Sequence, residues 1–200
     1  MAKAKRRAKS ARSRSAAGQQ DAIALLKADH RQVEEWFAQF ESTRSDGRKQ
    51  KLALQCCQAL KVHTQIEEEI FYPAFLEATE EEDIHHEAEV EHDGAKKLIA
   101  EIEASQPDDD YYDAKVKVLS EMIKHHVNEE EKRDGMFAKA RKSDMDLKAL
   151  GEQLAARKAA LMGGEAEEEE PSSMRSGGTR RNHTRSPGLV SRLAKRVRGE

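Results

Sequence analysis

The chain of 200 residues is 37% hydrophobic and 36% charged, whereas typical globular domains are roughly 45–50% apolar and roughly 25% charged, so its composition predicts amphipathic helices rather than a large apolar core. No apolar run approaches the roughly 20 residues of a membrane-spanning helix, and the start of the chain lacks the apolar stretch of a secretory signal. Cys56 and Cys57 are adjacent and poorly placed to bridge each other, and nothing in the sequence implies an oxidising compartment, so we expect a cytoplasmic protein. The net charge of the chain is −3.

The two ends of the chain are basic and of low complexity. Residues 1–14 carry seven basic residues and no acidic one, and we expect residues 1–18 to form a disordered arm. Residues 163–200 begin with two glycines, and within them residues 171–200 carry eight basic residues and one acidic residue. We expect this tail to be disordered too. Residues 15–170 are left with a net charge of −17.

Four long segments between these ends have apolar residues at steps of three or four, the period of an amphipathic helix. They span about residues 21–41, 46–78, 80–104 and 109–140, and a shorter helix is expected at 147–162. Asp21 can cap the first helix and Asp108–Asp110 the fourth, and Pro73 should kink the second or end its regular part. Strand-like alternation is absent. We therefore predict an all-α fold, an up-down-up-down four-helix bundle over residues 19–142 with an accessory helix at 143–162.

Each predicted helix carries polar residues on its apolar stripe. The stripes comprise residues 23, 26, 30, 33, 37 and 40; 52, 56, 60, 63, 67, 70 and 74; 84, 88, 92, 95, 99 and 102; and 112, 116, 119, 123, 126, 130 and 137. At about 1.5 Å per residue and with alternating helix directions, their polar members fall within about 6 Å along the bundle axis. These six polar residues are His30, His63, Glu67, His92, His126 and Glu130.

This shared layer predicts a metal centre. Burying an ionised carboxylate costs several kcal/mol unless it is paired or coordinated. Imidazole and carboxylate ligands together suit iron, manganese or zinc, and six side chains are more than one zinc normally uses, so we predict two metals. In the alternative interpretation, inward histidines are hydrogen-bonded core residues and the acidic runs Glu67–Glu69 and Glu129–Glu131 are solvated faces. That alternative does not explain why six groups share one depth.

At these residues the sequence resembles the hemerythrin-like, or HHE cation-binding, family. The matching segments are ADHRQV at 28–33, HTQIEEEIFYP at 63–73, VEH at 90–92 and HHVNEEE at 125–131. The resemblance covers about residues 21–140 and implies a non-haem di-iron centre, bridged by oxo or carboxylate groups, in a four-helix bundle. Manganese and zinc are less expected. Family activities include reversible oxygen binding, oxygen or iron sensing, and handling of nitric oxide or peroxide.

Two positions depart from the family pattern. Oxygen-carrying members have two histidines one turn apart on the third helix, whereas Ala88 stands one turn before His92 here. Glu89 is the best replacement nearby; without it, the position is left to water or an exogenous molecule. On the fourth helix Glu131 is a rival to Glu130, because Phe137 is not followed by the proline that many relatives have.

We favour a protein that binds or senses oxygen, nitric oxide, peroxide or iron over a dedicated enzyme. A di-iron oxidase or peroxidase could use the same ligands, and saturable turnover of peroxide would distinguish it. The basic ends suggest a third hypothesis, binding to nucleic acid or to an anionic membrane surface. Their alternative role is to keep an acidic body soluble. The sequence does not fix the oligomeric state.

Overall fold

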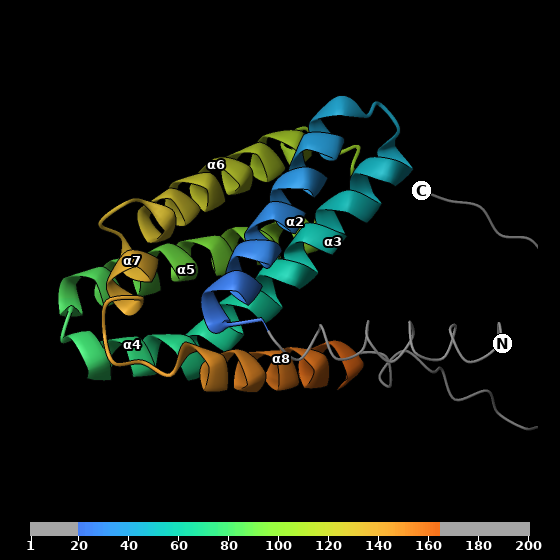
Figure 1. The fold of residues 1–200 in the computed structure, drawn as a ribbon. Helices are drawn as coiled ribbons and strands as arrows, with labels where there is room; N and C mark the ends of the chain where they lie inside the picture. The colour runs from blue at the N-terminus through green and yellow to red at the C-terminus, as the bar shows by residue number, and fades with distance from the viewer. Residues whose placement is uncertain (1–19, 165–200) are drawn as a thin grey trace, which may run out of the picture. The chain divides into compact units, whose positions relative to one another are not determined.

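The computed structural model describes residues 20–164, and every regular element in this part of the chain is helical (Figure 1). The arm expected at residues 1–18 and all but the first two residues of the tail expected at 163–200 lie outside the described residues. Within residues 20–164, no helix has the length and apolar character needed to cross a membrane.

Four helices form the bundle: α2 (Ala22–Ser42), α3 (Asp46–Ile66), α5 (Glu82–Glu103) and α6 (Tyr112–Glu131). The chain continues from α3 through the π-helical turn η1 (Glu67–Phe71) into α4 (Tyr72–Thr79), and α6 is followed by α7 (Met136–Ala140) and α8 (Leu147–Gly164). Helix α2 packs on α3, α3 on α5, α5 on α6, and α6 on α2, which closes the ring. The predicted all-α bundle with an additional C-terminal helix is confirmed.

The predicted helix caps have different outcomes. Asp21 caps α2, because its carboxylate accepts a hydrogen bond of 2.7 Å from the backbone N–H of Ala24. Helix α6 has Tyr111 at its N-cap position, without a side-chain hydrogen bond, so the cap predicted among Asp108–Asp110 is wrong. Asp109 instead accepts a bond of 2.8 Å from the backbone N–H of Gln106 and holds the loop's own turn.

The second predicted helix changes register after Glu67. In η1 the backbone N–H of Tyr72 bonds to the carbonyl of Glu67, five residues earlier. Pro73 has no N–H, and in a regular α-helix its ring would clash with the carbonyl four residues before it, so the widened turn lets the helix continue. The extra residue moves the buried face by one position. Phe71 and Phe75 are therefore fully buried in place of the predicted stripe residues 70 and 74.

The fourth predicted helix is broken between Glu131 and Met136, so one continuous helix at 109–140 is wrong there. The chain turns back at Gly135, where a Cβ atom would lie 2.2 Å from the backbone oxygen of Glu129. Only glycine fits so close to that carbonyl. Phe137, which the stripe placed inside, is nevertheless buried because α7 returns to the bundle.

Helix α8 lies outside the ring of four helices and packs on α2, α3 and η1 (Figure 1). The backbones come close at Gly151, where a Cβ atom would lie 2.4 Å from the backbone oxygen of Gln20. Leu154 is fully buried in the same contact region. The helix extends to Gly164, two residues beyond its predicted end.

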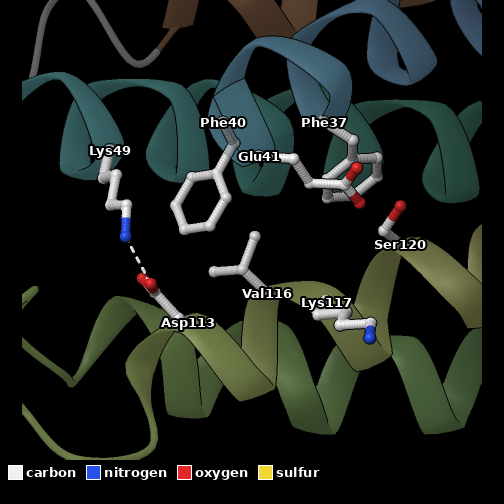
Figure 2. A pocket seen from close by; sticks show the side chains of 8 residues that line it. All are labelled: Phe37, Phe40, Glu41, Lys49, Asp113, Val116, Lys117 and Ser120. Carbon is white, nitrogen blue, oxygen red and sulfur yellow. Dashed lines mark hydrogen bonds and ion pairs between the residues drawn. The ribbon is translucent and has the colours of Figure 1, made fainter. Parts of the chain in front are cut away.

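The apolar core is divided into two clusters. One contains Val33, Phe37 and Leu60, and the other contains Leu26 and Phe75. Because the predicted polar residues occupy the turns between these clusters, they form a polar layer across the bundle. A surface cavity of about 340 Å³ opens between α2 and α6 beside the first cluster, and the residues shown lining it in Figure 2 include no member of the polar layer.

Candidate metal centre

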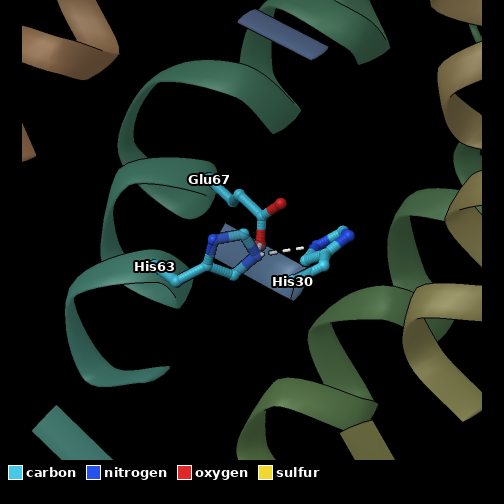
Figure 3. A group of neighbouring side chains, drawn as sticks. All are labelled: His30, His63 and Glu67. Atoms are coloured by element: carbon cyan, nitrogen blue, oxygen red, sulfur yellow. Dashed lines mark hydrogen bonds and ion pairs between the residues drawn. The ribbon is translucent and has the colours of Figure 1, made fainter. Parts of the chain in front are cut away.

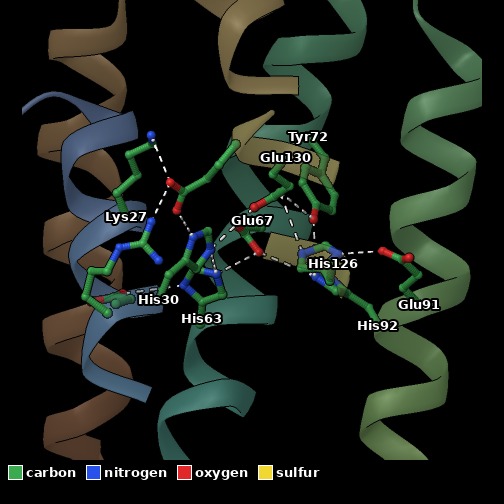
Figure 4. Close-up of polar contacts among 12 residues, drawn as sticks. Lys27, His30, His63, Glu67, Tyr72, Glu91, His92, His126 and Glu130 are labelled. Carbon is green, nitrogen blue, oxygen red and sulfur yellow. Dashed lines mark hydrogen bonds and ion pairs between the residues drawn. The ribbon is translucent and has the colours of Figure 1, made fainter. Parts of the chain in front are cut away.

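The structure brings all six predicted side chains together in one buried layer (Figure 4). Each is at most 4% exposed, and every one of the four bundle helices, with η1, contributes at least one of them. We refer to this set as the polar layer: His30, His63, Glu67, His92, His126 and Glu130.

One half of the polar layer is built by α2 and by the junction of α3 and η1. The Nε2 atoms of His30 and His63 lie 3.1 Å apart, and Oε2 of Glu67 lies 3.2 Å from Nε2 of His63 (Figure 3). From the opposite side, Oε2 of Glu130 lies 3.4 Å from Nε2 of His30. Two imidazoles and two carboxylates thus meet at one point.

The other half repeats this arrangement on α5 and α6. The Nε2 atoms of His92 and His126 lie 3.3 Å apart. Oε2 of Glu67 lies 3.5 Å from Nε2 of His92, and Oε1 of Glu130 lies 3.7 Å from Nε2 of His126. Glu67 and Glu130 therefore contact both halves, as carboxylates that bridge two cations would do.

The polar layer fits cations rather than a self-contained hydrogen-bond network. Both carboxylate oxygens of Glu67 and Oε2 of Glu130 are buried without a hydrogen-bond partner. Buried polar atoms are rarely left unpaired, because each costs free energy. The Nε2 atoms of two facing imidazoles at 3.1 Å cannot both carry a hydrogen. Cations between the halves would satisfy the oxygens and nitrogens together.

Four further carboxylates hold the outer nitrogens of the histidines. Glu131 lies 2.8 Å from Nδ1 of His30, Glu68 lies 2.9 Å from Nδ1 of His92, and Glu91 lies 2.7 Å from Nδ1 of His126. The fourth carboxylate, Asp29, faces Nδ1 of His63 with its Oδ2 at 3.5 Å, which is an ion-pair distance and not a hydrogen bond. A hydrogen bond at Nδ1 fixes the tautomer and turns the Nε2 lone pair inward, as in many metal sites. We call Asp29, Glu68, Glu91 and Glu131 the outer carboxylates.

The outer carboxylates follow a rule that sequence reasoning missed. Each supports the histidine of the next helix around the ring, and each is the sequence neighbour of a polar-layer residue on its own helix. Asp29 and Glu91 precede their neighbours, whereas Glu68 and Glu131 follow theirs. Successive residues are rotated by about 100° around a helix, so on antiparallel helices the preceding and the following residue point the same way around the bundle. The sequence signal that could have identified the outer carboxylates is an acidic residue directly next to a polar-layer residue. It stands before that residue on α2 and α5, and after it on η1 and α6.

The acidic runs Glu67–Glu69 and Glu129–Glu131, which the alternative interpretation treated as solvated faces, thus contribute to the site. Glu68 and Glu131 each bond to a histidine of the polar layer. The structure also separates Glu130 from its predicted rival, because Glu130 is 2% exposed and points inward while Glu131 contacts His30 from outside. Glu89 does not reach the layer. Its side chain is 53% exposed and lies 3.8 Å from His85, so its suggested role as a replacement ligand is wrong.

Tyr72 is a further site residue that sequence reasoning missed. Its hydroxyl lies 3.2 Å from Nε2 of His92 and 3.2 Å from Oε1 of Glu130, and its ring stacks on His92 (Figure 4). It is fully buried, and it faces inward because η1 shifts the register of the helix before it. Tyr72 therefore supplies a hydroxyl to the His92/His126 half of the layer, on the side where Ala88 lines a cleft.

In the absence of cations, protons balance part of the charge of the polar layer. Burial lowers the pKa of His30 to about 4, and the neighbouring His63 acts in the same direction. For His63, burial is outweighed by Glu67 and Asp29, which raise its pKa to about 10. Burial and the charge of Glu67 raise the pKa of Glu130 to about 8. Cations that bind here must displace protons from Glu130 and His63.

Two cavities adjoin the polar layer. One of about 10 Å³ lies among its four histidines and apolar residues that include Val33 and Ile123, and has room for about one water-sized molecule. The other, of about 280 Å³, opens to the surface between α5 and α6 and is lined by Ala88, His126 and Glu130 among others. A small molecule could therefore approach the α5–α6 half of the layer from outside.

Comparison with known proteins agrees with this geometry. The family model described as the Hemerythrin HHE cation binding domain matches residues 21–139. A crystal structure of a hemerythrin HHE cation binding domain-containing protein from Mycobacterium kansasii is 24% identical, with a TM-score of 0.62 over 74% of this chain and 91% of that one. This likeness shows a shared fold. No curated protein matches the chain significantly.

Proposed function

The chain belongs to the hemerythrin HHE cation-binding family and is a metal-binding, hemerythrin-like protein, and from this premise we propose that its polar layer holds two iron ions that bind or sense a small ligand. The ligand classes are oxygen, nitric oxide, peroxide and, for an iron sensor, iron itself. Family membership supports cation binding, and the number of cations, their identity and the ligand are what we add.

One observation carries the proposal: Glu67 and Glu130 lie between two separate pairs of imidazoles. His30 and His63 would hold one cation, and His92 and His126 the other. Glu67 reaches an imidazole nitrogen of each half with the same oxygen, Oε2, and Glu130 reaches one with each of its two oxygens, all within 3.7 Å. Together the six residues offer enough ligands for two cations, and more than a single cation would need.

Iron is the metal that best combines this ligand set with the proposed ligands. Mixed imidazole and carboxylate sites accept iron, manganese or zinc, but zinc has no redox chemistry. Bound iron would supply a change of oxidation state and open positions for a diatomic molecule. The outer carboxylates hold the imidazoles in place while this charge changes, and Val33 and Ile123 keep bulk water from the enclosed side.

The small space on the enclosed side of the polar layer favours binding or sensing of a small ligand there over turnover of an organic substrate. The enclosed cavity holds about one water-sized molecule. Peroxide is small enough to be turned over here, so an oxidase or peroxidase is the alternative function. Saturable consumption of peroxide by the iron-loaded protein would favour the enzyme, and a reversible spectral change without product would favour the sensor.

Metal analysis of protein purified without added metal tests the proposal directly. We expect about two iron ions per chain and the near-ultraviolet absorption of a bridged ferric pair, because two carboxylates connect the two imidazole pairs. A chain that holds one cation, or none after reconstitution with ferrous iron, would contradict the proposal. A content of two zinc or two manganese ions per chain would support the two-cation site but contradict the choice of iron.

The basic ends support a second, separate proposal, namely binding to nucleic acid. Residues 1–14 and 171–200 carry 15 basic residues and one acidic residue, and they lie outside the described part of the chain. Binding through them should weaken steeply as salt rises, because basic side chains displace counterions from phosphates. Deletion of both ends should abolish retardation of DNA or RNA and leave the metal content unchanged.

A further inference from the structure

Each outer carboxylate is itself held by a basic side chain. Glu131 bonds to Lys27 at 2.9 Å and to Arg31 at 2.6 Å, both from α2. Glu68 bonds to Lys96 of α5 at 2.6 Å, and Glu91 pairs with His125 of α6 at 3.3 Å. These basic partners all belong to the four-helix bundle, inside the region that the family model matches.

Asp29 is the exception, because its basic partner comes from outside the bundle. Oδ1 of Asp29 pairs with Nζ of Lys158, which lies on α8, beyond the end of the family match at residue 139. The other oxygen, Oδ2, faces Nδ1 of His63 at 3.5 Å, the longest of the four outer contacts. Asp29 is thus the carboxylate that faces the outer nitrogen of His63, and α8 holds Asp29 through Lys158.

The packing of α8 on the bundle places Lys158 beside Asp29. Arg157, its sequence neighbour, donates two hydrogen bonds to Glu69 of η1, at 2.6 Å and 3.0 Å. Gly151 allows α8 to approach the start of α2 closely, and Leu154 is fully buried between them. Polar and apolar contacts along α8 thus fix its register against α2 and η1.

We infer that α8 is a fifth helix of the metal centre and that Lys158 is a positioning residue for the His30/His63 half. Lys158 neutralises Asp29 on its outer side and keeps Oδ2 turned toward His63, which in turn directs Nε2 to the cation. The His92/His126 half has its own supports, Glu68 and Glu91, and neither of them pairs with Lys158. This inference rests on the proposed two-cation function and predicts that Lys158 acts on one cation only.

The test uses the full chain loaded with ferrous iron and challenged with a chelator. In Lys158→Met we expect one of two bound iron ions to be released about tenfold faster than in the unmodified chain, the lower end of the effect of losing an outer hydrogen-bond partner. The second ion should be released at the unmodified rate. Lys158→Arg should restore slow release. Lys148→Met, at an exposed position of the same helix, is the matched control and should change neither rate.

A double-mutant cycle separates positioning from a general loosening of the fold. With Asp29→Asn in place there is no charge to neutralise, so adding Lys158→Met should not accelerate release further. Equal acceleration of both ions in Lys158→Met, an undiminished effect in the Asp29→Asn background, or unchanged release would each overturn the inference. An unmodified chain that does not hold two ions would instead overturn the proposed function, and the inference with it.

Discussion

The hydroxyl of Tyr72 lies 3.2 Å from Oε1 of Glu130 in the interior of the bundle. Tyr72 is fully buried and Glu130 is 2% exposed, so this hydrogen bond lies in the protein interior. The contact joins the residue that the π-helical turn brought inward to a carboxylate that touches both halves of the polar layer.

Tyr72→Phe should destabilise the metal-free protein. The variant keeps the ring and its stacking on His92 but removes the donor to Glu130, and a buried polar group left unpaired costs about 1–3 kcal/mol. We expect the free energy of unfolding, measured with denaturant on the chelator-treated protein, to fall by about that amount. Tyr111→Phe is the control, because Tyr111 is 73% exposed. A similar loss in both variants would argue against a specific role for the Tyr72 hydroxyl.

His63→Ala should remove metal from the His30/His63 half. The variant leaves His30 as the single imidazole there, so we expect the iron content to fall from about two toward about one per chain. His86→Ala, at an exposed position outside the layer, should keep both ions. Elemental analysis after removal of loosely bound metal measures the difference. If both variants lose iron equally, the assignment of inward residues is wrong.

Glu131→Gln should weaken metal binding although the residue lies outside the polar layer. The amide cannot reproduce the charged contact at 2.8 Å that holds His30, and loss of such a partner typically lowers metal affinity by about 10–100-fold. Glu129→Gln changes a more exposed acidic residue in the same run and should have little effect. Competition with a coloured chelator gives both affinities. Indistinguishable affinities would mean that the outer carboxylates do not tune the site.

Much of the layer could be predicted from sequence because it rests on local periodicity. Steps of three and four residues place His30 and His126 on buried faces whatever the neighbouring helices do. Antiparallel packing then aligns the depths. All six residues predicted for the layer are at most 4% exposed for this reason.

The register after Glu67 could not be obtained in the same way. Residues 70, 71, 72, 74 and 75 are all apolar, aromatic or small, so two helical faces fit the local pattern equally well. The π-helical turn selects the face that buries Phe71 and Tyr72, and that choice depends on packing against other helices. The contact of Lys158 with Asp29 could not be predicted for a related reason, because the periodicity of α8 does not indicate where this helix packs on the bundle.

Metal binding should release protons at neutral pH. In the metal-free protein, burial and the charge of Glu67 raise the pKa of Glu130 to about 8, while Glu67 and Asp29 outweigh burial and raise the pKa of His63 to about 10. Both groups carry a proton at pH 7 and must lose it to bind a cation, so metal binding should release protons.

The sign of the pH dependence follows from this competition. As pH rises from 7 to 9, Glu130 loses its proton before the cation arrives, so the affinity for metal should increase through about pH 8. Calorimetric titration in buffers with different ionisation enthalpies counts the released protons. A binding heat that does not depend on the buffer would contradict the predicted proton release.

Ala88→Leu should slow the access of a small ligand to the His92/His126 half. Ala88 is 4% exposed and lines the cleft of about 280 Å³ that reaches His126 and Glu130, so a leucine side chain would occupy that space. Extra methyl groups in a packed region cost about 1–3 kcal/mol, which leaves a measurable folded state to be confirmed by circular dichroism. The readout is the rate at which nitric oxide changes the visible spectrum of the reduced, iron-loaded protein in a stopped-flow experiment.

The control for this prediction is Val90→Leu, which enlarges a residue that is 73% exposed on the same helix. It should leave both the rate and the iron content unchanged, whereas Ala88→Leu should change the rate alone. The distinction matters because a lower iron content would indicate damage to the site rather than a blocked path. If Ala88→Leu reacts at the unmodified rate with both ions in place, the ligand does not enter through this cleft.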